Sequence, residues 1–556
     1  MSERIFVGVA WPYANGSLHL GHIAGSYLPA DIFARYHRVA GNEVLMVSGS
    51  DQHGTPITLL AESRKVSPQV IVDQYHKEFL ETWQKFGITF DLFTNTGTSN
   101  HEAVVHEVFK KFVTDGTIYK ATTPQPYCKT CQRFLPDRYV EGKCPFCGFQ
   151  GARGDQCDNC GKPLDPIQLI GIRCRISGDT PEIRDSEHFF LKLSAFEEKL
   201  LEWIQPKSNL RPDVQNFTVN FLKAGLHDRA ITRDIEWGVR IPLPGYDSKR
   251  IYVWFEAVCG YLSASKEWAV LQNTPEKWKD FWQDPSAKSY YFMGKDNIPF
   301  HTIVWPAILM GAGGLNLPYD VPANQFLTLE GQKLSTSRNW AVWMPDYLSN
   351  FAPDPLRYYL SLNMPESSDI DFSWLDFMRA NNNELVATYG NLVHRTLTFT
   401  HRNFDGAVPE PGALDDEAKQ VLQMCEAMIA EVADAVSACR FKAGLKSAMA
   451  LAKEANRYID AKAPWKTIKT DRQETARTLW TTIALISGLK TAFYPFIPFS
   501  SAKLHKMLGN QDQVEKAGWR WHKPEPGTKF SFPEPLFAKM EEATIQKEIE
   551  KLGKRP

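Results

Sequence analysis

Two histidines near the start of the chain have the spacing of a phosphate site. His19 and His22 flank Gly21 and follow a short apolar run that begins at Ile5. We predict a buried strand, a loop and a helix start here, which together point backbone N–H groups and the positive end of a helix dipole at an anion. The imidazoles would add donors that stabilise a phosphate in its transition state. The alternative is a pair of histidines bonded to backbone or water.

A carboxylate follows the second apolar run of the chain. Residues 44–47 are apolar, and the polar residues after them include Asp51 and His53. Ligands of open α/β sheets bind beyond the carboxyl ends of the strands. Asp51 could therefore bind the ammonium group of a substrate, and the alternative is that it caps the next helix.

The α/β pattern returns after about residue 240. We predict a strand that runs into a helix over residues 251–261, and another strand that ends at Gly294. Asp296 follows that glycine closely and could accept hydrogen bonds from ribose hydroxyls. Three nearby side chains would be ordinary core residues unless they share a pocket: Trp254, Tyr261 and His301.

Six of the ten cysteines form three Cys-x-x-Cys pairs, a clustering that indicates metal binding rather than disulfides in a reducing compartment. Two pairs are close enough to share one structural zinc ion through four thiolates: Cys144, Cys147, Cys157 and Cys160. A second zinc ion would have only three thiolates, Cys128, Cys131 and Cys174, because Ser177 stands where another cysteine would be expected. Four thiolates leave no open coordination position, so zinc is not expected to be catalytic.

The last third of the chain is predicted to be helical, with apolar residues at helical spacing at Leu385, Tyr389, Leu392 and Thr396. Asn391 and Arg395 lie on a polar stripe and could read an unstacked base together. Pro464 ends a further helix, and Trp465 after it could stack on a base. The alternative is that the stripe is the solvated face of the helix.

Length and composition limit the possible classes of protein. A chain of 556 residues should form several domains, and its net charge of −1 argues against a purely electrostatic nucleic-acid binder. No apolar run is long enough for a membrane span, and the first residues lack the apolar region of a signal peptide, so we expect a cytoplasmic protein without a membrane partner. Residues 82–122 are predicted to be largely helical.

A second charged element, the loop at residues 330–339, carries Lys333, Arg338 and three hydroxyls. Such a loop is usually a solvated face. Beside His19-Leu20-Gly21-His22, however, it resembles the second signature of the class I aminoacyl-tRNA synthetases. The sequence is similar to the methionyl-tRNA synthetases, and to their archaeal-type branch with multiple zinc knuckles, in motifs that occur in order along nearly the whole chain: residues 12–16, 19–22, 51–56, 134–138 in the cysteine-rich insertion, 254–261, 294–296 and 333–337.

The signature loop departs from the usual Lys-Met-Ser-Lys-Ser form of that family. Leu334 replaces the methionine and Thr336 replaces the second lysine, which leaves Lys333 as the main cation. Losing one charge-assisted contact to a developing phosphate charge could cost a few kcal/mol unless it is compensated.

The resemblance implies a role for each matching position. Asp51 would bind the ammonium of L-methionine. The methionine side chain would lie against Trp11, Tyr13, Trp254, Ala257, Val258, Tyr261 and His301. ATP would be bound by His19, Gly21, His22, Gly294, Asp296, Lys333 and Thr336, with Mg²⁺, and the catalytic residues would be His19, His22 and Lys333. Asn391, Arg395 and Trp465 would read the anticodon of tRNA(Met), including the initiator tRNA.

The resemblance also implies an α/β, Rossmann-type nucleotide-binding catalytic domain with a zinc-knuckle insertion, followed by an all-α anticodon-binding bundle. We expect the catalytic domain at 1–118 and 241–325, the insertion at 119–240, a signature-loop and stem-contact region at 326–384, the bundle at 385–528 and a charged tail at 529–556. The chain would be a monomer.

Three alternatives stay open at this point. Another synthetase of the class, such as the cysteine or leucine enzyme, would share the signatures. An adenylyltransferase would also use the paired histidines but would be indifferent to tRNA. A zinc-knuckle RNA-binding protein that has lost catalysis would bind tRNA and release no pyrophosphate.

Overall fold

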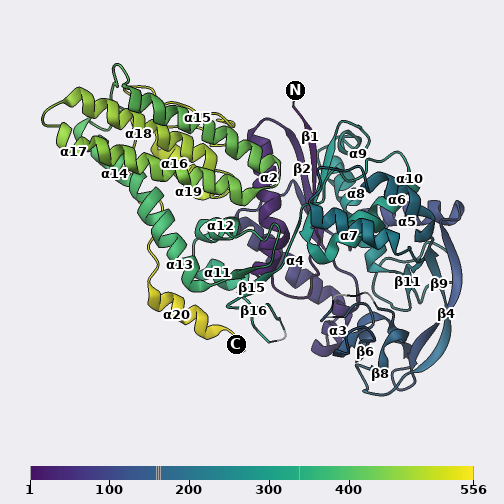
Figure 1. Cartoon of the computed structure of the whole chain (residues 1–556). Coiled ribbons are helices and arrows are strands. Elements are labelled where there is room, and N and C mark those ends of the chain that lie inside the picture. Colours follow the sequence, from purple (N-terminus) through teal and green to yellow (C-terminus); the bar gives the residue numbers. More distant parts are fainter. Residues whose placement is uncertain (1, 158, 161, 163, 337, 555–556) are drawn as a thin grey trace.

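A computed structural model describes residues 2–157, 159, 160, 162, 164–336 and 338–554. A parallel sheet lies at the centre, a helical bundle extends from one side of it, and the cysteine-rich insertion lies on the opposite side (Figure 1). None of the helices in the described part of the chain combines the length and hydropathy of a membrane span.

The central sheet has five strands in the order β14-β13-β1-β2-β3. Every neighbouring pair is parallel. The strands are β1 (Arg4–Val9), β2 (Glu43–Ser50), β3 (Leu92–Asn95), β13 (Lys288–Gly294) and β14 (Ala323–Asn324). The chain builds outward from β1 in one direction and then returns to its other side, so ligands are expected at the carboxyl ends of β1 and its neighbours. The predicted α/β parallel-sheet domain is confirmed.

Helices cover both faces of this sheet, which explains why its strands are continuous apolar runs. Ile5, Val7 and Val9 of β1 pack in the same core cluster as α2 (Leu28–Val39). Phe6, between them, packs on the other face with α8 (Val253–Leu271). Alternate residues of one strand therefore anchor two different helical layers.

Two sequence-based assignments were wrong in part. About half of residues 82–122 are helical, but not continuously, because α4 (Pro68–Phe86) ends before Gly87, β3 intervenes before α5 (Ser99–Thr114), and β4 (Ile118–Cys128) begins inside the segment. The strand expected at the start of residues 251–261 is only the end of β12 (Arg250–Ile251), and α8 takes up the rest. A buried apolar run has no periodicity that separates strand from helix.

The insertion is built on a long antiparallel pair, β4 with β9 (Glu182–Leu191). Between these strands a small sheet in the order β7-β6-β8 carries the cysteine knuckles. The remaining strands of this region are β5 (Arg133–Phe134), β6 (Val140–Lys143), β7 (Gln150–Arg153), β8 (Ile170–Cys174), β10 (Arg229–Ala230) and β11 (Thr232–Arg233). Its helices are α6 (Glu197–Ile204) and α7 (Pro212–Lys223).

The signature loop belongs to a second small sheet in the order β16-β15-β17. The strands are β15 (Leu327–Leu329), β16 (Gln332–Lys333) and β17 (Ile370–Phe372). The helices next to these strands in the sequence are α11 (Met344–Asn350), α12 (Pro353–Leu362) and α13 (Trp374–Ala380). Earlier in the sequence come α9 (Lys279–Trp282) and α10 (Trp305–Ala312).

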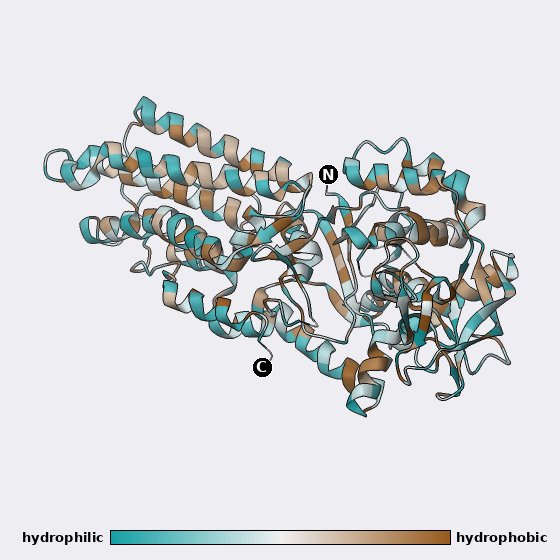
Figure 2. Ribbon diagram, turned by 60° about the horizontal axis from the view of Figure 1, so that its bottom comes forward, coloured by the Kyte–Doolittle hydropathy of each residue, from teal (hydrophilic) through white to brown (hydrophobic). Residues whose placement is uncertain are grey.

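The bundle begins with a continuous helical segment, in which the π-helical η7 (Asn381–Gly390) leads into α14 (Asn391–Asn403). It continues through α15 (Asp416–Ser437), α16 (Phe441–Lys462), α17 (Pro464–Thr467), α18 (Arg472–Phe493) and α19 (Pro498–Met507). The predicted apolar face is confirmed, since Leu385, Tyr389, Leu392 and Thr396 are all buried. Outward faces of the long helices are hydrophilic and inward faces hydrophobic (Figure 2).

The bundle and the sheet domain share one core. A single apolar cluster includes residues of β1, α2, α12 and the bundle helices. A buried charge cluster crosses the same junction, in which the Arg357 guanidinium of α12 binds Asp31 of α2 at 2.6 Å and donates to the Phe496 carbonyl at 2.9 Å. Arg35 of α2 donates to the Tyr494 hydroxyl at 2.9 Å. The last helix, α20 (Glu542–Lys551), packs on α13, and Gly553 after it donates to the Asn339 carbonyl of the signature loop.

Candidate active site

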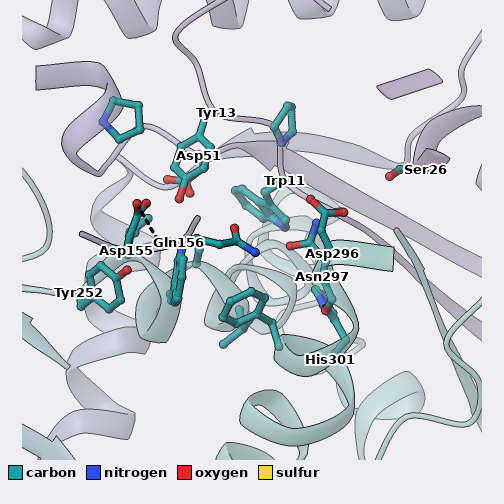
Figure 3. Close-up of a pocket in the computed structure, with 18 of the residues that line it drawn as sticks. Trp11, Tyr13, Ser26, Asp51, Asp155, Gln156, Tyr252, Asp296, Asn297 and His301 are labelled. Atoms are coloured by element: carbon teal, nitrogen blue, oxygen red, sulfur yellow. Dashed lines mark hydrogen bonds between the residues drawn. The ribbon is translucent and has the colours of Figure 1, made fainter. Parts of the chain in front are cut away.

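A cavity of about 310 Å³ opens at the carboxyl ends of β1, β2 and β13 (Figure 3). Every side chain predicted to hold methionine lines it: Trp11, Tyr13, Asp51, Trp254, Ala257, Val258, Tyr261 and His301. His22 and Asp296, predicted for ATP, also line it. Residues separated by about 290 positions in the sequence thus share one pocket, which was the condition for regarding Trp254, Tyr261 and His301 as more than core residues.

Two glycines set the position of Trp11, the first cavity residue after β1. A Cβ atom at Gly49 of β2 would lie 2.3 Å from the Trp11 ring, and one at Gly260 of α8 would lie 2.7 Å from it. Both distances are far below a normal contact, so only glycine on each side lets the indole lie flat between strand and helix. The indole therefore forms a fixed wall of the cavity.

Tyr261 and His301 satisfy each other's polar atoms. The His301 Nδ1 lies 3.0 Å from the Asn297 carbonyl, which can only accept, so Nδ1 carries the proton. The Tyr261 hydroxyl then donates to His301 Nε2 at 2.7 Å. Burial lowers the pKa of His301 to about 4, which keeps the ring neutral at neutral pH. With its donors used internally, this corner of the cavity presents an apolar surface to a ligand.

Asp51 is buried at the end of β2 and held on both sides. Its backbone N–H donates to the Pro12 carbonyl and its carbonyl accepts from Ala14, both at 2.8 Å. Its carboxylate accepts from the His53 N–H at 3.1 Å. Burial and the nearby Glu256 carboxylate raise the pKa of Asp51 well above its usual value, so a cation in the cavity would be favoured. The alternative as a helix cap does not hold, because α3 (Thr55–Arg64) begins after Gly54 without a side-chain cap.

The paired histidines lie at the first turn of α1 (Leu20–His22), which continues into the π-helical η1 (Ile23–Tyr27). Their rings stack at 3.9 Å. His19 Nδ1 accepts from the Gly21 N–H at 3.1 Å, and His22 Nδ1 accepts from the His19 N–H at 3.2 Å. Since Nδ1 accepts in both rings, each neutral ring carries its proton on Nε2.

The same pair is kept neutral by its surroundings. Burial lowers the pKa of His22 to about 4. Burial, and then the neighbouring His22, lower the pKa of His19 well below its usual value. The two interpretations of the histidine pair, as backbone-bonded rings or as phosphate donors, are therefore compatible. Nδ1 of each ring accepts from a backbone N–H, and Nε2–H of each ring stays available as a donor to a ligand.

The signature loop lies against this histidine turn. Leu334 Cδ1 would be 2.8 Å from a Cβ atom at Gly21. Main-chain bonds hold the segment just after the loop to the histidine turn, since Leu20 donates to the Val342 carbonyl at 3.2 Å and Met344 donates to the Leu18 carbonyl at 2.8 Å. Lys333 and Thr336 are exposed to solvent, and neither lines the cavity. Ser337 of the loop lies outside the described residues.

Gly294 and Asp296, the predicted ribose residues, lie at the end of β13 and just after it. Asp296 Oδ1 would be 2.8 Å from a Cβ atom at Gly294, so a glycine here lets the carboxylate fold over the strand end. Burial raises the pKa of Asp296 above its usual value.

Four residues of the insertion that were not predicted for the site also line the cavity: Asp137, Arg138, Asp155 and Gln156. Arg138 Nε binds Asp155 Oδ2 at 2.8 Å. Figure 3 shows Gln156 projecting into the middle of the pocket. These residues adjoin the cysteine knuckles, and nothing in their spacing indicates that the insertion folds back onto the sheet.

The cysteines form the two predicted clusters. In the first, Cys147 and Cys157 lie 3.6 Å apart and Cys144 and Cys160 lie 3.9 Å apart, measured between sulfurs. All four sulfurs lie within 4.8 Å of one another and could hold a metal ion. Four convergent thiols are the donor set that zinc prefers in structural sites.

The second cluster brings together Cys128, Cys131 and Cys174, whose sulfurs also lie within 4.8 Å of one another. The Ser177 hydroxyl lies 3.4 Å from Cys128 Sγ, at the position where a fourth thiol would complete the set.

The three predicted base-reading residues gather far from the cavity, at the bundle. Arg395 lies one helical turn after Asn391 on α14 and stands 5.9 Å from the Trp465 ring. Asp460 and Asn456 of α16 hold the Arg395 guanidinium at 2.6 and 2.9 Å. Trp465 is 41% exposed, so part of its side chain is open to solvent.

Fold and site together define a class I aminoacyl-tRNA synthetase. The family model described as "tRNA synthetases class I (M)" matches residues 5–397, and the model described as "Anticodon binding domain of methionyl tRNA ligase" matches residues 408–555. The chain belongs to the methionyl-tRNA synthetase family, and its activity is that of a methionine–tRNA ligase.

Individual relatives agree along the full length. A methionine–tRNA ligase of Dehalococcoides mccartyi is 57% identical over 553 residues, which is 100% of both chains. That of Thermomicrobium roseum is 52% identical over 99% of both chains. Among solved structures, Mycobacterium tuberculosis methionyl-tRNA synthetase in complex with methionyl-adenylate aligns with a TM-score of 0.81 at 25% identity, covering 97% of this chain and 100% of the other.

Proposed function

We propose that the cavity at the carboxyl ends of β1, β2 and β13 carries out both steps of the ligase reaction. L-methionine and ATP would form methionyl-adenylate and pyrophosphate, and methionine would then pass to the 3′-terminal adenosine of tRNA(Met). What supports the proposal most is that the side chains matched to methionine recognition line one cavity, which also reaches His22 and Asp296.

Methionine would enter with its ammonium on the buried Asp51 carboxylate and its thioether against Trp11, Tyr261 and His301. Sulfur–aromatic contacts contribute roughly 0.3–1.5 kcal/mol each, which is too little to exclude other apolar side chains. The fixed indole, and the Tyr261–His301 pair with no donor to offer, would select by shape and by leaving polar side chains without partners.

In the first step a methionine carboxylate oxygen would attack the α-phosphorus of ATP, and the bond to the bridging β-phosphate oxygen would break. Two Nε2–H donors from His19 and His22 would face the phosphate without changing charge. Lys333 would bind the leaving pyrophosphate, aided by Thr336, while Gly21, Gly294 and Asp296 would hold the nucleoside. Mg²⁺ would come with ATP and neutralise phosphate charge.

The tRNA anticodon would bind at Asn391, Arg395 and Trp465. Arg395 is already oriented by Asp460 and Asn456, so little side-chain entropy would be lost on binding. Base stacking on Trp465 would contribute about 1–3 kcal/mol. The initiator tRNA would be among the substrates, and the enzyme would act as a cytoplasmic monomer.

Zinc would be held by Cys144, Cys147, Cys157 and Cys160, where it would cross-link the knuckles and so fix the insertion that bears Asp155 and Gln156. A second ion at Cys128, Cys131 and Cys174 would need a fourth, non-thiolate ligand. Metal analysis of the purified protein should find at least one zinc ion per chain, and Cys157→Ser should remove one. A metal-free wild-type protein of full activity would contradict this assignment.

Exchange of radioactive pyrophosphate into ATP with each amino acid in turn tests the catalytic proposal. We expect exchange with methionine, and loss of at least 100-fold in kcat/KM for methionine in Asp51→Ala, since a buried charge pair is broken. Exchange stimulated by cysteine or leucine instead of methionine would contradict the substrate assignment. Exchange that needs no amino acid would favour an adenylyltransferase.

A further inference from the structure

A second buried carboxylate lies behind the amino-acid cavity. Glu256 is in the first turn of α8, between the cavity residues Trp254 and Ala257, and none of its surface is exposed. Its side chain does not line the cavity. A fully buried carboxylate is costly unless its oxygens are bonded, so its partners indicate why it is there.

Both oxygens of Glu256 bind histidines from other elements. Oε1 lies 2.9 Å from Nδ1 of His53, in the turn after β2, and Oε2 lies 2.6 Å from Nε2 of His101, in α5. His101 Nδ1 is in turn 2.9 Å from the Ser263 hydroxyl, whose own hydrogen goes to the Gly260 carbonyl at 3.1 Å. These two histidines lower the pKa of Glu256 despite its burial, which by itself would raise it.

One of these histidines leads directly to Asp51. The His53 N–H donates to Asp51 Oδ1 at 3.1 Å, while the His53 ring is held by Glu256. The other side of Asp51 is fixed by the main chain of residues 12–14. Without Glu256, the His53 ring would lose its only described acidic partner, and the turn that aims the Asp51 carboxylate would lose its link to α8.

We propose that Glu256 is a positioning residue for the ammonium group of methionine, acting through His53 on Asp51. It would couple α8, which supplies the wall around the thioether, to the turn that supplies the ammonium carboxylate. The thioether and the ammonium group of methionine would then be bound by one rigid unit. The inference rests on the proposed role of Asp51 as the ammonium-binding residue.

The substitution Glu256→Met tests the link, because methionine has a similar volume and bonds neither histidine. The measurement compares the dissociation constants of L-methionine and of its des-amino analogue, 4-(methylthio)butanoate, from the fluorescence of the cavity tryptophans. We expect E256M to weaken L-methionine about tenfold and the analogue less than twofold, since only the ammonium contact is misdirected. Equal weakening of both ligands would overturn the proposal, because it would mean a general structural defect.

A conservative variant and a matched control sharpen the result. Glu256→Gln can still accept from His53 and donate to His101, so it should stay within about twofold of wild type for both ligands. Glu267→Met makes the same substitution on the same helix, at a carboxylate that accepts instead from the Thr94 hydroxyl at 2.9 Å, and should leave the ratio of the two constants unchanged. Loss of ammonium selectivity in E267M equal to that in E256M would also count against the proposal.

Two further variants separate the possible failures. If E256M does not fold, His53→Ala removes the ring while keeping the N–H that binds Asp51, and it should produce the same selective loss. Asp51→Asn tests the proposed function itself. If D51N weakens both ligands equally, Asp51 is not the ammonium residue. If D51N is selective but neither E256M nor H53A is, only the role of Glu256 is wrong.

Discussion

The amino-acid side and the phosphate side of the active site are built differently. Around the proposed methionine position, Asp51, Tyr261 and His301 are each at most 4% exposed and held by hydrogen bonds from several elements. Across the sheet edge, Lys333 is exposed at the end of β16 and Thr336 is exposed in the turn that follows, and the loop contacts the histidine motif through the apolar Leu334. The proposed methionine site is therefore preformed, whereas Lys333, the proposed cation for the leaving phosphates, lies outside the cavity.

The largest effect should come from the exposed side. Lys333→Ala should lower kcat for pyrophosphate exchange by about 100- to 1000-fold, because it removes the main positive charge that would stabilise the leaving pyrophosphate. The KM for methionine should change less than twofold, since the cavity is untouched. Gln332→Ala, next to it, is the control. A K333A enzyme with an unchanged kcat would remove the distinction between the two sides.

A smaller effect should follow from altering the fixed wall. Gly260→Ala would place a Cβ atom 2.7 Å from the Trp11 ring and push the indole into the cavity. We expect the KM for methionine to rise about tenfold and the free energy of unfolding to fall by about 1–3 kcal/mol, with the KM for ATP unchanged. Gly25→Ala, where the new Cβ would meet no atom within 4 Å beyond its neighbours in the chain and its own helix backbone, should change none of these values. An increase confined to the KM for ATP would reverse the assignment of the two sides.

Both sides of the proposed site should also be sensitive to acid, through His22 on the phosphate side and His301 on the amino-acid side. Burial lowers the pKa of His22 and of His301 to about 4 in the folded protein, below the ordinary value of about 6.5 that applies in the unfolded chain. As the pH falls below 6.5, the unfolded chain takes up protons first, so stability is full above that pH and is lost progressively down to about pH 4. Urea midpoints between pH 7 and pH 4.5 measure this loss, which His22→Asn should reduce. A midpoint independent of pH would contradict the burial of these rings.

The smallest effect should be a gain. Thr336→Lys restores a second cation to the exposed loop and should raise kcat for exchange by up to about fivefold. Its KM for methionine should equal that of the wild type. A fall in kcat would mean that another group already occupies the position of the second cation.

Much of this site could be predicted from residue types at strand ends. His19, Asp51 and Asp296 each follow an apolar run, and in a parallel sheet such positions converge on one edge. The cysteine spacings likewise predicted both clusters, down to the incomplete second one. These features depend on local chain geometry, which can be inferred from the spacing of residues in the sequence.

The rest depends on contacts between distant segments. Gln156 enters the cavity only because the long β4–β9 pair carries the knuckles back over the sheet. The role of Glu256 was not predicted, because its histidine partners are distant in the sequence. Only the fold of β2 and α5 brings His53 and His101 to this carboxylate. The short strand β3 was missed because four residues between two helices carry too little periodicity.

The junction between sheet and bundle has a consequence for how the molecule melts. The charged cluster at this junction is buried when the bundle is in place: Arg357, Arg35 and Asp31. The apolar cluster around it includes residues of both halves. Pulling the halves apart would hydrate that surface and break this cluster in one event. Scanning calorimetry should therefore record a single cooperative transition, and a gene fragment encoding the bundle alone should yield an insoluble product.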